Sequence, residues 1–127
     1  MYRRLTIAVL VLATACGART PGATSSQSRG PNNVVTQDEI ATVPVDNAYD
    51  AIEHLRPQFL RPHVTGSRRP AYAVVFIDGV RRGGPEVLRS IAAKTVTQIR
   101  YLTSADATTR YGLDIEGGVI EVTLGLR

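Results

Sequence analysis

VTQIRYLTSADATTRYGLDIEGGVIEVTL, residues 96 to 124, is the stretch that decides the fold class. It begins with β-branched and aromatic residues up to Leu102, a composition that favours a strand. Ser104 can cap a short helix that Gly112 ends. Residues 119 to 124 form a second β-branched run, which is typical of a strand. The stretch therefore predicts a strand, a helix and a second strand, and we expect the last strand to be paired inside a sheet.

The same alternation of strands and helices is predicted upstream. Residues 33 to 36 are β-branched, and Thr36 and Glu39 have the spacing of a capping box that opens a short helix. Asp46 can cap a second helix, and Pro57 falls in the last turn of that helix and should end it. These residues predict one strand followed by two helices.

The middle of the sequence predicts a buried strand. Residues 72 to 77, YAVVFI, form an uninterrupted apolar run, as expected of a strand that is buried on both faces. Asp78 and Gly79 then predict a tight turn, and Pro85 marks the first turn of another helix. Residues 61 to 70 are polar and contain two prolines, so we expect an exposed loop there.

The order of these elements indicates the fold class. The order is β-α-α-β-α-β-α-β, which predicts an α+β domain with a small mixed sheet and short helices packed on it. The chain has 127 residues, of which 43% are hydrophobic, and this is enough for one small domain with one core. We assign that domain to residues 33 to 127.

The N-terminus has the layout of an export signal. Arg3 and Arg4 precede an uncharged stretch, residues 5 to 15, and Cys16 follows as the only cysteine. The uncharged stretch is much shorter than the roughly 20 residues that cross a bilayer as a helix. Residues 1 to 15 are therefore predicted to be a cleaved signal peptide.

Two processing routes fit the residues around Cys16. Ala13-Thr14-Ala15-Cys16 resembles a bacterial lipobox, in which the cysteine thiol receives a diacylglyceryl group before cleavage, although Ala13 stands where leucine is commonest. The same residues satisfy the small-x-small rule for ordinary signal cleavage, which would leave a soluble periplasmic or secreted protein. A lone cysteine in an exported protein has no disulfide partner within its chain, and this favours lipidation of Cys16.

Lipidation would make the membrane a partner of this protein. Acyl chains on Cys16 would act as the anchor, and residues 16 to 32 are predicted to be the lipidated cysteine and a flexible linker. Gly17, in place of aspartate, is typical of lipoproteins that are forwarded to the outer membrane. We therefore expect a cell-envelope protein on the periplasmic face of the outer membrane.

Three stretches resemble the plug domain of TonB-dependent outer-membrane receptors. They are VVTQDEI with AYDAIEHLRP, then VVFIDGVRRGG, and finally the stretch from 96 to 124, and together they cover most of residues 33 to 124. The resemblance implies a plug-like fold. We expect no barrel after residue 127, and no motif for contacting TonB is evident, so we expect a stand-alone module that does not gate a pore.

No catalytic or metal-binding motif is evident. His54 and His63 are the only histidines and do not form a metal pair, and Asp46 and Asp50 share a helix face with His54 that we interpret as solvated. Residues 79 to 84, GVRRGG, lack the Gly-Lys-Ser/Thr ending of a phosphate loop. We expect no metal, no cofactor and no small-molecule substrate.

Serines and acidic loop residues lead to the same expectation. Ser67, Ser90 and Ser104 lie in no Gly-x-Ser-x-Gly elbow. Asp114 and Glu116 form a carboxylate pair in a glycine-bounded loop, but calcium needs more ligands than this loop offers.

The charge of the chain excludes a nucleic-acid partner. The formal net charge is +4, and removing Arg3 and Arg4 from the 15 basic residues leaves 13 against 11 acidic ones. No dense basic stripe with interleaved aromatic residues is present.

The remaining basic residues are unevenly distributed, because four arginines occur as two adjacent pairs. Arg68 and Arg69 precede the predicted strand of residues 72 to 77, and Arg81 and Arg82 follow it, so we expect both pairs in loops at its opposite ends. One interpretation is solvated charge that aids solubility. The other is a docking surface for an acidic protein, a lipid headgroup or a polysaccharide.

These patterns favour a membrane-anchored, non-enzymatic interaction module of the bacterial cell envelope with an envelope protein as its partner. The alternatives are an accessory subunit of an envelope transport complex and a small envelope enzyme without a recognisable motif.

Overall fold

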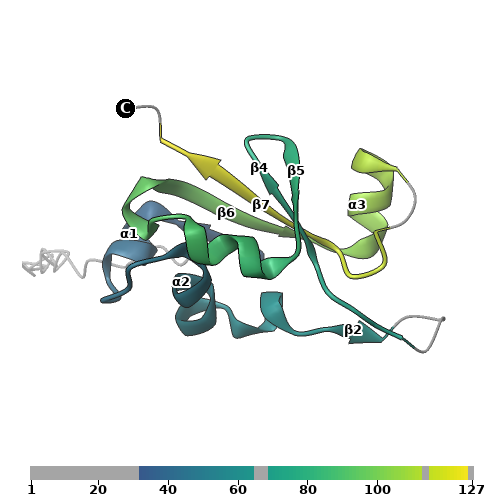
Figure 1. Ribbon diagram of the computed structural model, residues 1–127, viewed down its shortest axis with the longest axis horizontal. Helices are drawn as coiled ribbons and strands as arrows, with labels where there is room; N and C mark the ends of the chain where they lie inside the picture. Colours follow the sequence, from purple (N-terminus) through teal and green to yellow (C-terminus); the bar gives the residue numbers. More distant parts are fainter. Residues whose placement is uncertain (1–31, 65–68, 113–114, 126–127) are drawn as a thin grey trace, which may run out of the picture.

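A five-stranded mixed sheet with short helices on both faces forms the centre of the molecule (Figure 1). The computed structural model describes residues 32–64, 69–112 and 115–125. The predicted α+β class is confirmed, and the predicted strands and helices occur in the predicted order with additional short elements between them.

The strand order in the sheet is β1-β6-β7-β4-β5. Its strands are β1 (Val34–Thr36), β4 (Val74–Ile77), β5 (Val80–Gly83), β6 (Val96–Leu102) and β7 (Val119–Leu124). β7 pairs with β6 in the antiparallel sense and with β4 in the parallel sense. The last strand is therefore paired on both sides, as predicted.

The helices are short, and half of them have the tighter 3-10 geometry. They are α1 (Gln37–Ala41), α2 (Ala48–Leu55), α3 (Ser104–Tyr111) and the 3-10 helices η1 (Pro57–Leu60), η2 (Pro85–Ser90) and η3 (Ala93–Thr95). Pro85 stands at the first position of η2, as predicted.

Side-chain caps decide where the α-helices begin. The predicted capping box opens α1: the N–H of Glu39 donates to Thr36 Oγ1 over 3.4 Å, and the N–H of Thr36 donates to Glu39 Oε2 over 3.0 Å. The cap of α2 is Asn47, whose Oδ1 accepts from the N–H of Asp50 over 2.9 Å. The expected cap, Asp46, is one residue too early.

The start of α3 and the ends of α2 and α3 lie within one or two residues of the predicted positions. Thr103, and not Ser104, caps α3, and Gly112 ends it with a φ of 94°. α2 ends at Leu55, two residues before Pro57, as predicted from the ring's effect on helical hydrogen bonding.

Residues 80 to 83 form a strand, which the sequence did not predict. Asp78 and Gly79 have φ values of 49° and 81°, and positive φ at both central residues is typical of the tight hairpin turn that returns the chain against β4. The register shifts where Phe76 faces Arg81, so β5 carries a β-bulge. The second arginine pair therefore lies on an edge strand and not in a loop.

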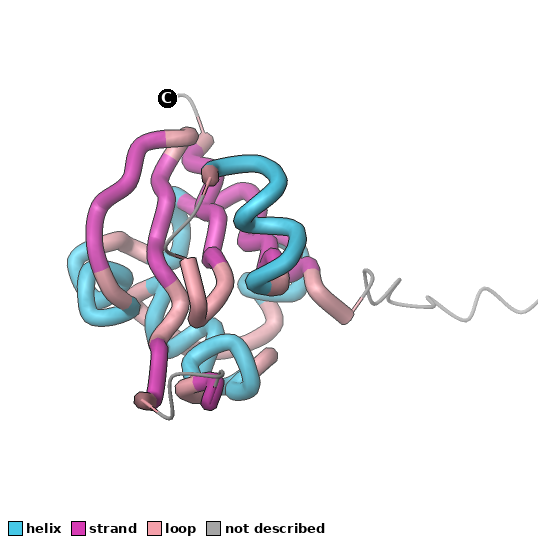
Figure 2. The backbone as a smooth tube through the Cα atoms, turned by 90° about the vertical axis from the view of Figure 1, so that its right-hand side faces the viewer, coloured by secondary structure: helices cyan, strands magenta, loops and turns pink. Residues whose placement is uncertain are grey.

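Two apolar clusters lie on the two faces of the sheet. The first packs under α1, α2 and the 3-10 helices, and the second packs under α3, which lies towards the right of Figure 1, the side that faces the viewer in Figure 2. On β4, Val75 is fully buried in the first cluster and Phe76 is 7% exposed in the second. The predicted burial of this strand on both faces is confirmed, but Tyr72 lies outside the strand and is 56% exposed.

The expected loop of residues 61 to 70 carries a short strand at each end. β2 (His63–Val64) pairs in the antiparallel sense with β3 (Pro70–Ala71). The prediction of an exposed loop is wrong for these flanks in that they form strands, because backbone hydrogen bonds form there despite the polar composition.

Candidate functional site

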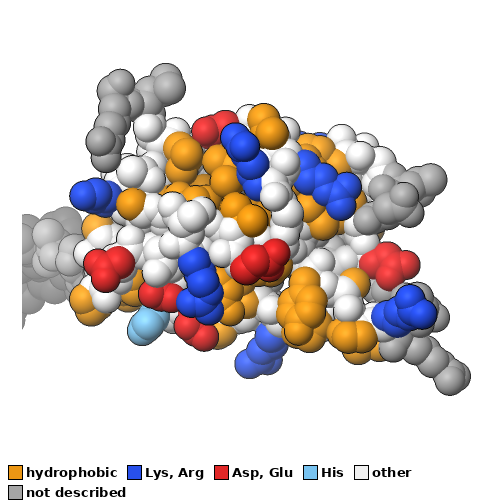
Figure 3. All heavy atoms as spheres, viewed as in Figure 1, with side chains coloured by type: hydrophobic (Ala, Val, Ile, Leu, Met, Phe, Trp, Pro, Cys, Tyr) orange, Lys and Arg blue, Asp and Glu red, His pale blue; other side chains and the backbone are white. Residues whose placement is uncertain are grey.

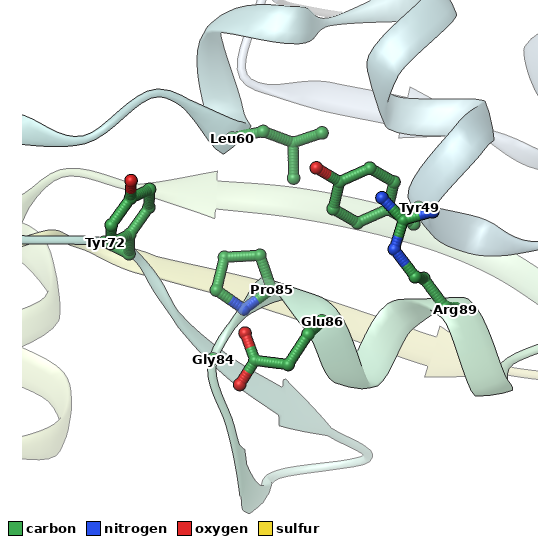
Figure 4. Close-up of a pocket in the computed structure, with 7 residues that line it drawn as sticks. All are labelled: Tyr49, Leu60, Tyr72, Gly84, Pro85, Glu86 and Arg89. Carbon is green, nitrogen blue, oxygen red and sulfur yellow. The ribbon is translucent and has the colours of Figure 1, made fainter.

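A groove of about 420 Å³ opens on the face of the sheet that carries α2, η1 and η2. Figure 4 shows Leu60 and Tyr49 on one side of it, Pro85 and Glu86 on the other, and Tyr72 at one end. Gly84 and Arg89 complete the lining. Four separate segments of the chain therefore build this groove, which sequence reasoning missed.

Buried neighbours hold the lining residues in place. Tyr49 follows the fully buried Ala48 on α2, and Leu60 follows Phe59, which is 3% exposed. Leu88, between Glu86 and Arg89 on η2, is also fully buried. The segments that carry the lining residues are therefore anchored in the core, while Glu86 and Arg89 reach solvent.

Arg89 makes two contacts at the rim of the groove. Its guanidinium carbon lies 3.8 Å from the centroid of the Tyr49 ring, a cation–π contact worth about 0.5–1 kcal/mol at an exposed site. Its Nη1 lies 3.9 Å from Oδ1 of Asp50, whose other carboxylate oxygen accepts from Asn47 Nδ2 over 2.9 Å. The groove thus presents a positioned cation, with the carboxylate of Glu86 also in its lining.

A stack of three rings joins the small sheet to the main one. The rings of Phe59 and Tyr101 are 5.0 Å apart, and those of His63 and Tyr101 are 5.8 Å apart. The Tyr101 hydroxyl donates to the carbonyl oxygen of Gly117 over 3.2 Å and lies 3.2 Å from Nε2 of His63. Burial raises the pKa of Tyr101. These contacts hold the segment that leads to Tyr72 in place.

A second polar cluster lies beside α3. The Tyr111 hydroxyl donates to Glu121 Oε1, and Arg110 Nε lies 3.2 Å from the same oxygen. Burial, followed by the hydrogen bond to Glu121, raises the pKa of Tyr111. This cluster ties α3 to β7 and lies on the opposite face of the sheet from the groove.

The predicted arginine sites are only partly assembled. Arg81 and Arg82 are exposed on β5, and Arg69 is exposed immediately before β3. Arg68 and Cys16 lie outside the described residues. Figure 3 shows the face that carries the groove, where basic, acidic and apolar side chains alternate along its middle.

The remaining candidates of the sequence have local roles where the structure describes them. His54 Nδ1 lies 2.9 Å from the carbonyl oxygen of Asp50, Ser90 donates to the carbonyl oxygen of Val87, and Ser104 donates to that of Glu116. The described residues contain no cluster of three potential metal ligands. Ser67 and Asp114 lie outside them.

Comparison with known proteins returned no match, whether against protein-family models, curated proteins or solved structures. No helix in the described part of the chain is long and apolar enough to span a bilayer.

Proposed function

We propose that this protein is a lipid-anchored, non-enzymatic interaction module of the bacterial cell envelope that binds a segment of a partner protein in the groove. The observation that carries this proposal is the groove itself, which two tyrosines, a leucine and a proline line beside the guanidinium group of Arg89. Tyrosine supplies contact area at low entropy cost and is common at recognition surfaces.

The size and openness of the groove favour a peptide segment. About 420 Å³ lies near the lower end of ligand-site volumes and accommodates one or two side chains. Tyr72 is 56% exposed at one end, so the groove is not closed around its contents. A peptide can place a side chain inside while its backbone continues along the surface.

The plug-like fold is part of this proposal and rests on the sequence resemblance. The stretches that carry the resemblance form β1, α1, α2, β4, β5, β6, α3 and β7. Their strands make up the five-stranded sheet, in the order β1-β6-β7-β4-β5. Only the fold is inferred from the resemblance to plug domains, and partner binding is assigned to the groove.

Site-directed photo-crosslinking in intact envelopes tests the proposed function. A photoreactive residue at Leu60, which lines the groove, should give an adduct of one discrete mass with a partner protein. The same residue at Ala105, exposed on α3, serves as the control and should give none of that adduct. Adducts that are equal at both positions, or absent at both, would refute a groove-specific partner.

A second variant separates binding from folding. Tyr72→Ala removes an exposed ring and should reduce the adduct at Leu60 while leaving the melting temperature nearly unchanged. An undiminished adduct would show that the groove does not hold the partner.

A further inference from the structure

We propose that β5 accepts an acidic extended segment of a partner protein as a sixth strand of the sheet, and that this segment continues into the groove. The inference rests on the proposed function and adds the conformation and the charge of the bound segment.

β5 has one free side among the described residues. It is the last strand in the order β1-β6-β7-β4-β5, and its only described strand partner is β4. Half of the backbone N–H and C=O groups of an edge strand point away from its partner, so they can pair with an added chain. Backbone pairing of this kind supplies affinity, and side-chain pockets supply specificity.

The free strand leads directly into the groove. Gly83, the last residue of β5, is followed by Gly84 and Pro85, which line the groove. Tyr72 lines it from the chain that enters β4, the strand beside β5 (Figure 4). A chain that pairs along β5 therefore reaches the groove within a few residues, at about 3.3 Å per residue.

The charge of β5 selects an acidic occupant. Arg81 and Arg82 are both exposed, and neither takes part in the ion pairs found among the described residues. The nearest carboxylate in sequence is Asp78, whose Oδ1 accepts from the N–H of Leu124 over 3.0 Å. Glu86 lies beyond the strand, in the groove. Glutamate or aspartate on an added strand would face two free guanidinium groups.

Two other occupants fit this edge poorly. A second copy of the chain, paired antiparallel through the centre of β5, would place Arg81 against Arg82 of the copy, and like charges directly opposite each other are destabilising. The linker of this chain, residues 17 to 31, contains two arginines, two prolines and no acidic residue. Charge therefore opposes both, and it favours an acidic segment of another protein.

The experiment uses the full chain as bait for a displayed library of random peptides of about 12 residues, a length that spans both β5 and the groove. Selected peptides should carry two adjacent acidic residues, which would lie opposite Arg81 and Arg82, and an apolar residue further along for the groove. The best peptide should bind the Arg81→Glu/Arg82→Glu variant about tenfold more weakly at low salt and the Arg81→Lys/Arg82→Lys variant within about threefold of wild type.

Backbone methylation of the selected peptide tests strand addition on the wild-type protein. N-methyl groups on one alternate set of amides should abolish binding, while those on the other set, which point away from β5, should have little effect. This result does not depend on the folding of any variant.

Three results would overturn the proposal: no enrichment of acidic peptides, equal binding to the charge-reversed variant, or equal tolerance of both methylation sets. None of these results would refute the proposed function, which the crosslink at Leu60 tests separately. If that crosslink forms but any of the three results is obtained, the protein binds its partner in the groove without strand addition.

Discussion

Gly117 has no room for a side chain. A Cβ at this position would lie 2.1 Å from the carbonyl oxygen of Tyr72 and 2.8 Å from that of Ala71. Both are backbone atoms and cannot rotate away. We predict that Gly117→Ala lowers the free energy of unfolding by about 1–3 kcal/mol, the range for an overpacked site, as measured by chemical denaturation.

Gly84 is the matched control for that substitution. A Cβ there would meet the carboxylate of Glu86 at 2.6 and 2.7 Å, but this carboxylate is the end of a flexible side chain. Gly84→Ala should therefore change the free energy of unfolding by less than about 1 kcal/mol. Equal losses for the two variants would contradict the close backbone approach at Gly117.

The raised pKa of Tyr111 predicts that stability falls at alkaline pH. Its pKa is raised above 10.0, first by burial and then by the hydrogen bond to Glu121. Because the folded state favours the protonated hydroxyl, its contribution is complete below the unfolded pKa and is lost as the pH rises through the folded one. Thermal melting between about pH 9 and 11.5 should fall more steeply for wild type than for Tyr111→Phe. Parallel slopes would contradict this assignment.

At the beginning of α2, the sequence predicts Asp46 as the helix cap, whereas the structure has Asn47 in that role. Asn47 caps the helix, while the side chain of Asp46 is exposed. Asn47→Ala should lower the free energy of unfolding by about 0.5–2 kcal/mol, the range for loss of a helix cap, and Asp46→Ala should have a much smaller effect. Denaturant midpoints of the two variants decide between them, and a larger loss for Asp46→Ala would restore the original prediction.

Elements with strong local signals were predicted well. β6 and β7 have the predicted bounds, because both are rich in β-branched residues and are bounded by a cap or by glycines. β5 was missed because Val80–Gly83 contains two arginines and a glycine, and an edge strand needs backbone partners more than apolar side chains. Tyr72 was placed in a strand because an apolar run does not show where backbone pairing begins.

β7 should be indispensable to the fold. It lies between β6 and β4, and both Val119 and Ile120 are fully buried, on opposite faces of the sheet. We predict that a chain ending at Gly117 shows no cooperative thermal unfolding. The loss of β7 leaves β6 and β4 with unpaired edges and opens both apolar clusters. A chain ending at Gly125, which retains β7, is the control and should melt cooperatively. A cooperative transition in the shorter chain would contradict the central role of β7.

At the scale of the whole molecule, the groove was beyond sequence prediction. Its lining comes from α2, η1, the chain before β4 and the beginning of η2, and these segments meet only because the sheet order brings them together. No single sequence motif encodes the groove. The arginines of β5 were found from sequence by their charge, but their place on an open edge beside the groove depends on the unpredicted hairpin.

For the whole molecule, the proposed attachment to a membrane would depend on one atom, the sulfur of Cys16, which lies outside the described residues. A thiolate is a far stronger nucleophile than a hydroxyl, so Cys16→Ser should block transfer of the diacylglyceryl group. We predict that Cys16→Ser takes up no labelled fatty acid and is recovered unprocessed or soluble, while Thr14→Ser, which keeps the thiol, is labelled like wild type. Two acyl chains hold a protein firmly and their loss should release it. Equal labelling of Cys16→Ser and wild type would rule out the lipid anchor, and the proposed binding surface would then act without it.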